Sequence, residues 1–225
     1  MKYTIFKNDS DSYTLTLLHT TINTDNNNTI LFQSLLKTNI IPFGFILSEN
    51  ELYFKAENVT MLKECKELSI EQVLFLIHFL IKQIKYLESR GYTFYGFDIE
   101  DVIMINDDTF GIITTDYLTT IEKDKEDKNK NTICFWTPFV KPYFSSPELL
   151  NLTTLPSNIS YKSCYYSLAS LAIYLLWNEY ILKGNEIMVD DEIEEIMTPI
   201  YNTKLYWFLK RCLHTEGDKR LLFYI

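Results

Sequence analysis

Residues 83–103 read QIKYLESRGYTFYGFDIEDVI, and this stretch leads from a long apolar helix to a short strand. Gly91 is predicted to end the helix, because glycine readily adopts the left-handed conformation found at helix C-caps. Residues 96–101 combine one glycine with three carboxylates. The apolar run 102–105 then predicts a strand that pairs with 110–113 across a polar turn.

The helix that enters this stretch is predicted to begin after Ser69. Ser69 and Gln72 stand at the two positions of a capping box, and apolar residues follow at helical spacing as far as Leu87. Their apolar stripe is wide enough to bury the helix on most sides. A second apolar helix is predicted over 163–177. The last third, over 192–213, is predicted to be helical with an interruption at a proline.

The region before residue 56 has a different character. Its β-branched and aromatic runs predict short strands, and one short helix is expected over 30–36 after an Asn-rich loop over 24–29. The strands are expected at 3–6, 13–19, 43–47 and 52–55. The chain is therefore predicted to be α+β and two-lobed, with a reduced β-rich N-lobe (1–58) and a mainly helical C-lobe (59–225).

Composition excludes several classes of function. The 225 residues carry a net charge of −9, which argues against direct binding to nucleic acid. Only 6 glycines are present, none before Gly44, and no pair has the spacing of a phosphate-binding loop. The four cysteines form no CxxC pair, so buried free thiols in a reducing compartment are expected. Apolar runs are too short to cross a bilayer, and an intracellular, cytoplasmic protein without membrane contact is expected.

Four segments, in order, resemble landmarks of the protein kinase family. The first two resemble the helix that precedes the kinase catalytic loop and the loop itself, H-R-D-x-K-x-x-N-I-L. The third resembles the A-P-E motif, and the fourth resembles the kClxxdPxxR pattern near the end of the kinase domain. In this sequence they are 83–92, 94–103 (FYGFDIEDVI), 145–149 (SSPEL) and 211–220 (RCLHTEGDKR). The resemblance implies a protein kinase-like two-lobed fold.

The catalytic-loop segment departs from the family at the residues that carry chemistry. The resemblance places Gly96 at the proton-accepting aspartate, Asp98 at the neighbouring lysine and Asp101 at the metal-binding asparagine. The aspartate of the kinase D-F-G motif falls on Thr114 by strict spacing, or on Asp116 if the preceding hairpin is two residues longer. Shifting the alignment by two residues would place Asp98 at the proton-accepting position, but it would also place Ile103 at the metal-binding position. The shifted alignment therefore loses one functional residue for the one that it gains.

Two interpretations of Asp101 and Asp116 remain open. Asp101 and Asp116 could together hold a divalent cation through hard oxygen ligands. The alternative, which we favour, is a pair of surface turn aspartates, with no metal and no cofactor. The deep aspartate that braces the kinase loop falls on Cys164, and no brace is expected where there is no catalytic loop to orient.

One family interaction is expected to survive. The resemblance pairs Glu148 of the S-P-E triplet with Arg220 as an ion pair inside the C-lobe, a role that suits bidentate arginine–carboxylate geometry.

The sequence therefore resembles the kinase family at positions that stabilise the fold and departs from it at positions that carry out catalysis. This pattern predicts a minimal pseudokinase, a catalytically inactive domain that binds another protein as a scaffold, decoy or assembly component. One alternative is a degenerate but active serine/threonine-type kinase that uses ATP and Mg²⁺ through Asp98, Asp101 and Asp116. The other is an unrelated α+β structural protein. A composition rich in Asn, Ile and Lys is typical of an A/T-rich genome, such as that of a large DNA virus, and association with a virion would fit such a source.

Overall fold

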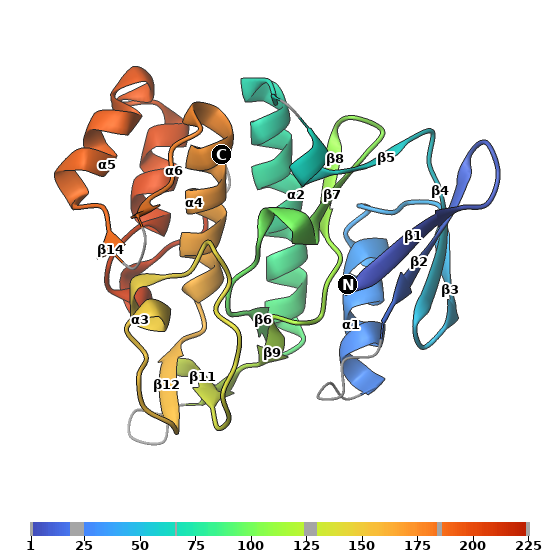
Figure 1. Cartoon of the computed structure of the whole chain (residues 1–225), viewed down its shortest axis with the longest axis horizontal. Helices are drawn as coiled ribbons and strands as arrows, with labels where there is room; N and C mark the ends of the chain where they lie inside the picture. Colours follow the sequence, from blue (N-terminus) through green and yellow to red (C-terminus); the bar gives the residue numbers. More distant parts are fainter. Residues whose placement is uncertain (1, 19–24, 66, 124–129, 184–185, 224–225) are drawn as a thin grey trace.

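The computed structural model describes residues 2–18, 25–65, 67–123, 130–183 and 186–223. The chain is mixed α+β, with 39% helix and 25% strand arranged in several small sheets. A four-stranded sheet lies at one end of the molecule, a long helix crosses its middle, and the later helices of the chain gather at the other end (Figure 1). Within the described residues, no helix has the length and apolar character needed to cross a membrane.

The four-stranded sheet contains the strands expected near the N-terminus. Its antiparallel order is β1-β2-β4-β3, and the α1 helix connects β2 to β3. Leu15 and Leu52 pair across neighbouring strands and are fully buried, so one face of the sheet belongs to the core. The bounds are β1 (Tyr3–Lys7), β2 (Ser12–Leu17), α1 (Asp25–Lys37), β3 (Gly44–Ser48) and β4 (Glu51–Lys55).

The prediction of a loop over 24–29 was wrong for the described residues of that segment, because α1 begins at Asp25. Two asparagines that suggested a loop instead make tertiary hydrogen bonds from the first turns of the helix. The Asn27 side-chain amide donates to the Leu118 carbonyl, and the Asn28 amide donates to Asn50 Oδ1 at 2.6 Å. Long-range bonds of this kind outweigh the weak helix propensity of asparagine. Thr24 lies outside the described residues.

The central helix α2 (Ile70–Ser89) has the expected cap and end. Ser69 and Gln72 form the capping box, and Gly91 adopts a left-handed backbone with φ of 79°. A buried polar side chain, Gln83, joins this helix to its neighbours. Its amide oxygen accepts from the Ile112 backbone N–H at 2.9 Å, and its amide nitrogen donates to the Ile112 carbonyl and to Ser34 Oγ. The helix is thereby tied to both α1 and the adjacent hairpin.

Short strands and helices complete the chain. The buried residues form a continuous cluster that runs across the boundary predicted at residue 58. The proline-interrupted helical region is present as α5 and α6. The bounds are β5 (Val59–Met61), η1 (Leu62–Glu64), β6 (Tyr92–Phe94), η2 (Ile99–Asp101), β7 (Val102–Ile105), β8 (Thr109–Ile112), β9 (Leu118–Thr120), β10 (Glu122–Lys123), β11 (Asn131–Phe135), α3 (Pro147–Leu150), β12 (Ser157–Ser160), α4 (Ser163–Trp177), β13 (Leu182–Lys183), β14 (Glu186–Ile187), α5 (Asp190–Met197), η3 (Thr198–Ile200), α6 (Lys204–Cys212) and η4 (Gly217–Lys219).

None of the four cysteines, all of which lie in the described residues, forms a disulfide, as expected. Cys164 and Cys212 are buried, whereas Cys65 and Cys134 are only half-buried, so the expectation of burial was wrong for two of them.

Candidate functional site

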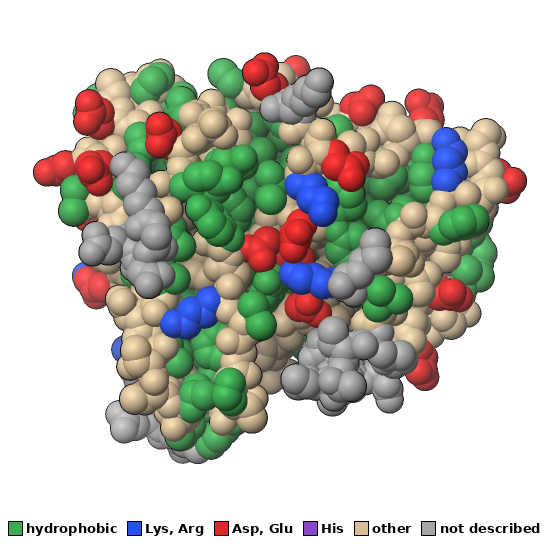
Figure 2. All heavy atoms as spheres, viewed as in Figure 1, with side chains coloured by type: hydrophobic (Ala, Val, Ile, Leu, Met, Phe, Trp, Pro, Cys, Tyr) green, Lys and Arg blue, Asp and Glu red, His purple; other side chains and the backbone are tan. Residues whose placement is uncertain are grey.

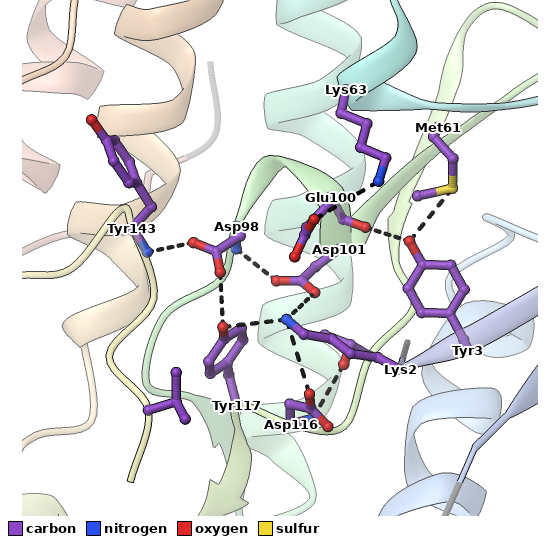
Figure 3. Close-up of polar contacts among 12 residues, drawn as sticks. Lys2, Tyr3, Met61, Lys63, Asp98, Glu100, Asp101, Asp116, Tyr117 and Tyr143 are labelled. Carbon is purple, nitrogen blue, oxygen red and sulfur yellow. Dashed lines mark hydrogen bonds and ion pairs between the residues drawn. The ribbon is translucent and has the colours of Figure 1, made fainter.

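The loop between β6 and β7 contains three of the candidate residues, Gly96, Asp98 and Asp101, and Figure 3 shows the polar contacts of the two aspartates. Asp101 ends the short turn η2 and is fully buried. One of its carboxylate oxygens accepts from the Asp98 backbone N–H at 2.7 Å. Its backbone carbonyl accepts from the Ile113 N–H at 2.9 Å, which fixes the loop against the end of β8. The Asp101 side chain is therefore held in one position by bonds on both sides of the loop.

Lys2 supplies the positive charge of the cluster. Its ammonium nitrogen lies 2.9 Å from Asp101 Oδ1 and 3.9 Å from Asp116 Oδ2, and it donates to the Tyr117 hydroxyl at 3.2 Å. Figure 3 shows Lys2 reaching from the start of β1 into the space between these groups. Lys2 was not predicted from the sequence, because nothing in its neighbourhood indicates a partner 99 positions away.

The Lys2 ammonium takes the position that a bridging cation would need between the two carboxylates. Asp101 and Asp116 do converge, but on Lys2. The favoured interpretation of two surface aspartates was therefore wrong for Asp101, which is buried. Among the described residues, no group of three or more His, Cys, Asp or Glu side chains could hold a metal ion. Burial raises the pKa of Asp101 to about 6, and the charge and hydrogen bond of Lys2 act in the opposite direction.

Asp98 holds the segment around Tyr143 in place through a hydrogen bond. One carboxylate oxygen accepts from the Tyr117 hydroxyl at 2.8 Å, and the other accepts from the Tyr143 backbone N–H. Burial and this hydrogen bond to Asp98 raise the pKa of Tyr117 strongly, so the phenol stays protonated and donating. Both oxygens of Asp98 are thus engaged in holding structure, which does not suit a general base.

Gly96 lies against the segment that Asp98 holds. A β-carbon built at Gly96 would overlap the ring of Pro142 and would lie 3.3 Å from Ser167 Oγ. Because Tyr143 is bonded to Asp98, the adjacent Pro142 is fixed over Gly96. Any side chain at this position, including an aspartate, would therefore require the Pro142 ring to move.

Asp116, and not Thr114, brings a carboxylate to this cluster. Thr114 is buried, and its hydroxyl accepts from the Asp116 backbone N–H at 3.2 Å. The Asp116 side chain is directed toward Lys2 (Figure 3). Of the two candidates for the D-F-G aspartate position, Asp116 is therefore the one whose carboxylate lies in the acidic cluster.

A brace on the loop is present, although none was expected. The Ser163 hydroxyl donates to the Tyr95 carbonyl at 2.7 Å and lies 2.8 Å from Ser146 Oγ. The adjacent Cys164 is fully buried, and its sulfur lies 3.5 Å from Thr93 Oγ1. The brace is therefore the hydrogen bond from the Ser163 hydroxyl to the Tyr95 carbonyl. A buried backbone carbonyl needs a hydrogen-bond donor whether or not the loop is catalytic.

Glu148 and Arg220 form a bidentate ion pair. The two guanidinium nitrogens donate to the two Glu148 oxygens at 2.6 and 2.7 Å. Arg220 is fully buried, and it also donates to the carbonyls of His214 and Thr215. The pair ties α3 to the C-terminal segment that follows α6.

A pocket of about 670 Å³ opens beside the cluster, between β1 and the segment from β5 to η1. Aromatic and aliphatic side chains line it, with Lys7, Lys63, Glu64 and Glu100 among its polar groups. The Tyr3 hydroxyl donates to the Glu100 carbonyl and contacts the Met61 sulfur (Figure 3), and all three residues line the pocket. Lys63 pairs with Glu100 at 3.8 Å.

No protein-family model matches this sequence, and no curated protein matches it.

Proposed function

We propose that this chain is a catalytically inactive protein kinase-like domain that acts by binding another protein, as a scaffold, decoy or assembly component. The observation that carries the proposal is the packing at Gly96. The residue at the position of the proton acceptor has no side chain, and Pro142 occupies the space that a side chain would need. A group with no ionisable atom cannot accept a substrate proton.

The kinase-like part of the proposal is supported by the order of elements and by one ion pair. The loop segment lies between β6 and the β7–β8 hairpin, and the S-P-E triplet opens α3. Glu148 and Arg220 meet with the bidentate geometry that the resemblance implies. These contacts join sequence landmarks that are 72 residues apart.

The inactive part is supported by what surrounds the acidic residues. Phosphoryl transfer relies on metal ions that neutralise the developing charge on the phosphates. Here the ammonium of Lys2 neutralises Asp101 and lies near Asp116. A metal ion would have to displace that lysine before both carboxylates could bind it. The sequence also has no glycine before Gly44 to form a phosphate-binding loop.

The binding part is supported by exposed apolar side chains next to the site. The segment 136–143 reads WTPFVKPY, and its residue Val140 is 72% exposed. Trp136 and Tyr143 are exposed on the same segment, at either end of it. Clustered exposed apolar groups of this kind are typical of a protein-binding surface.

Affinity capture from the cells that express the protein tests the binding role. We expect Val140→Asp to lose a partner that the wild type retains. Val189→Asp is the matched control, because Val189 is a similarly exposed valine at the start of α5. A partner retained equally by both variants would remove segment 136–143 from the binding surface. The absence of any specific partner would contradict the proposed role.

The clustering of Asp98, Asp101 and Asp116 beside a pocket of about 670 Å³ favours one second candidate, a degenerate serine/threonine-type kinase that uses Mg²⁺ and ATP. Transfer of radiolabelled phosphate from ATP tests it. We expect no incorporation above that of a heat-denatured sample. Incorporation that disappears in Asp98→Ala and Asp116→Ala would establish the second candidate instead.

A further inference from the structure

The β3 strand is an unprotected sheet edge. It stands last in the order β1-β2-β4-β3, and no strand in the described part of the chain pairs with its other side. Residues 43–48 read FGFILS and contain neither a charged residue nor a proline. Proteins commonly protect an edge with such residues, because unpaired backbone groups invite another strand. The one irregularity is a register shift between Ile46 and Ser48, near the end of the strand.

The side chains of this edge are apolar and exposed. Phe43 is 73% exposed and Phe45 is 55% exposed, and Leu47 is also exposed. The Phe45 ring rests against Tyr53, with 5.0 Å between ring centroids, so it is held on the outer face of the sheet. A β-carbon at Gly44 would instead meet Ile41 on the core side. Figure 2 shows hydrophobic side chains at the right-hand end of the molecule, where Figure 1 places β3.

Backbone groups of the strand also point to this edge, where no described strand pairs with them. The Lys55 N–H donates to the Phe43 carbonyl at 2.9 Å, so Phe43 and Lys55 form a hydrogen-bonded pair of the antiparallel ladder. Residues in such a ladder alternate between facing the partner strand and facing away from it. Gly44 and Ile46 therefore direct their N–H and C=O groups away from β4, toward the open side.

We propose that β3 pairs with β3 of a second copy of this chain, antiparallel and about a two-fold axis. The pairing would join two four-stranded sheets into one of eight strands. In the register that places Phe45 beside its own counterpart, Gly44 lies opposite the second copy's Ile46. The outward backbone groups of both copies are then satisfied reciprocally. This inference does not depend on the proposed kinase-like function.

Self-complementarity favours a second copy as the occupant, because the register centred on Phe45 satisfies the outward backbone groups of both copies at once. The net charge of −9 on each chain opposes association over most of the surface. The β3 edge is an uncharged stretch where two acidic molecules can approach. A two-fold contact places the same patch on both sides, and an apolar, uncharged strand is complementary to itself.

The contact is small, so the dimer is expected to be weak. The exposed parts of Phe43 and Phe45 together amount to about 250 Å², given the size of an aromatic side chain. A standard interface buries about 800 Å² per partner. We therefore expect monomer at low micromolar concentration and dimer at several hundred micromolar.

Sedimentation velocity across this concentration range tests the proposal. Wild-type protein should shift from monomer to dimer, and Phe45→Lys should remain monomeric throughout. Phe6→Lys is the matched control, since Phe6 is 68% exposed on β1 at the opposite edge of the same sheet, and it should dimerise like the wild type.

A second variant separates strand pairing from simple contact between apolar side chains. Ile46→Pro removes an N–H that points to the open edge and leaves the bonds to β4 in place. It should be monomeric at every concentration while its circular dichroism and melting temperature stay close to those of the wild type. Wild-type protein that is monomeric at all concentrations would overturn the proposal. So would a dimer or larger aggregate that persists in Phe45→Lys and Ile46→Pro.

Discussion

At Gly96 the missing side chain is a requirement of packing, because the Pro142 ring fills the adjacent space. The sequence alone singled out Gly96, Asp98 and Asp101, since all three fall within one recognisable segment. It could not identify Lys2 or Pro142, which approach the segment from distant parts of the chain. A close contact between residues so far apart leaves no local pattern for sequence reasoning to detect.

Gly96→Ala is expected to lower the free energy of unfolding by about 1–3 kcal/mol, the usual cost of overpacking a filled site. Urea denaturation measures the loss. In a Pro142→Ala background the overlap is relieved, so the same substitution should cost clearly less. Equal costs in the two backgrounds would show that the Pro142 ring does not occupy the space beside Gly96.

Lys2→Met should destabilise the protein more at pH 7.5 than at pH 5. The pKa of Asp101 in the folded protein is about 6, above its ordinary value of 3.8. Between these values the folded state holds a proton that the unfolded state releases, so the contribution of Asp101 to stability falls as pH rises toward 6. Above pH 6 the buried carboxylate is charged and needs the lysine. Below that pH it is largely neutral.

We expect the loss caused by Lys2→Met to differ by about 1–2 kcal/mol between the two pH values, since one pKa unit corresponds to about 1.4 kcal/mol. Urea denaturation at both pH values provides the measurement. Asp101→Asn is the control background, because it removes the titrating group, and the difference should vanish there. A loss that is the same at both pH values in the Asp101-containing protein would contradict the pairing of Lys2 with Asp101.

At the scale of elements, strong local signals predicted structure well. The capping box at Ser69 and the left-handed Gly91 delimit α2 as expected. The start of α1 was predicted five residues too late, because Asn27 and Asn28 satisfy their side chains through partners outside the helix. The short strands β5, β6 and β9 carry too few residues for a recognisable alternation, and their pairing is set by tertiary contacts.

The α3 helix has only four residues and cannot be stable by itself, so it depends on contacts with the rest of the fold, one of which is the ion pair at Glu148. Glu148→Ala leaves the fully buried Arg220 without its charged partner. We expect a loss of about 3 kcal/mol in the free energy of unfolding, at the lower end for a broken buried pair because Glu148 is partly exposed.

Thermal or urea denaturation of Glu148→Ala checks this value. Glu216→Ala is the matched control, because its pair with Lys219 lies on the surface, and its unfolding midpoint should stay near that of the wild type. If Glu148→Ala unfolds at the same denaturant concentration as Glu216→Ala, the ion pair does not hold α3 in place.

For the whole molecule, the composition and the order of elements were enough to predict an α+β chain. The sequence could not show which residues cover the candidate site. Lys2, just before β1, pairs with Asp101, and Tyr3 at the start of β1 donates to the Glu100 carbonyl, so both contacts join distant parts of the chain. Figure 2 shows this junction as acidic and basic side chains gathered in the middle of one face, between the sheet end and the helical end. The proposed loss of catalysis is therefore a property of the assembled fold.

Binding of Mg²⁺ and ATP tests this account most directly. A thermal-shift titration with up to 1 mM ATP and excess Mg²⁺ compares the melting temperature with that in Mg²⁺ alone. We expect no change, because Lys2 occupies the position between the two carboxylates and no glycine loop is present to cradle phosphates. A dissociation constant of about 10 μM would instead stabilise the protein by about 2.7 kcal/mol, which corresponds to a rise of roughly 5–10 °C. A saturable rise of that size would contradict the proposal of a kinase-like domain whose site is closed by its own residues.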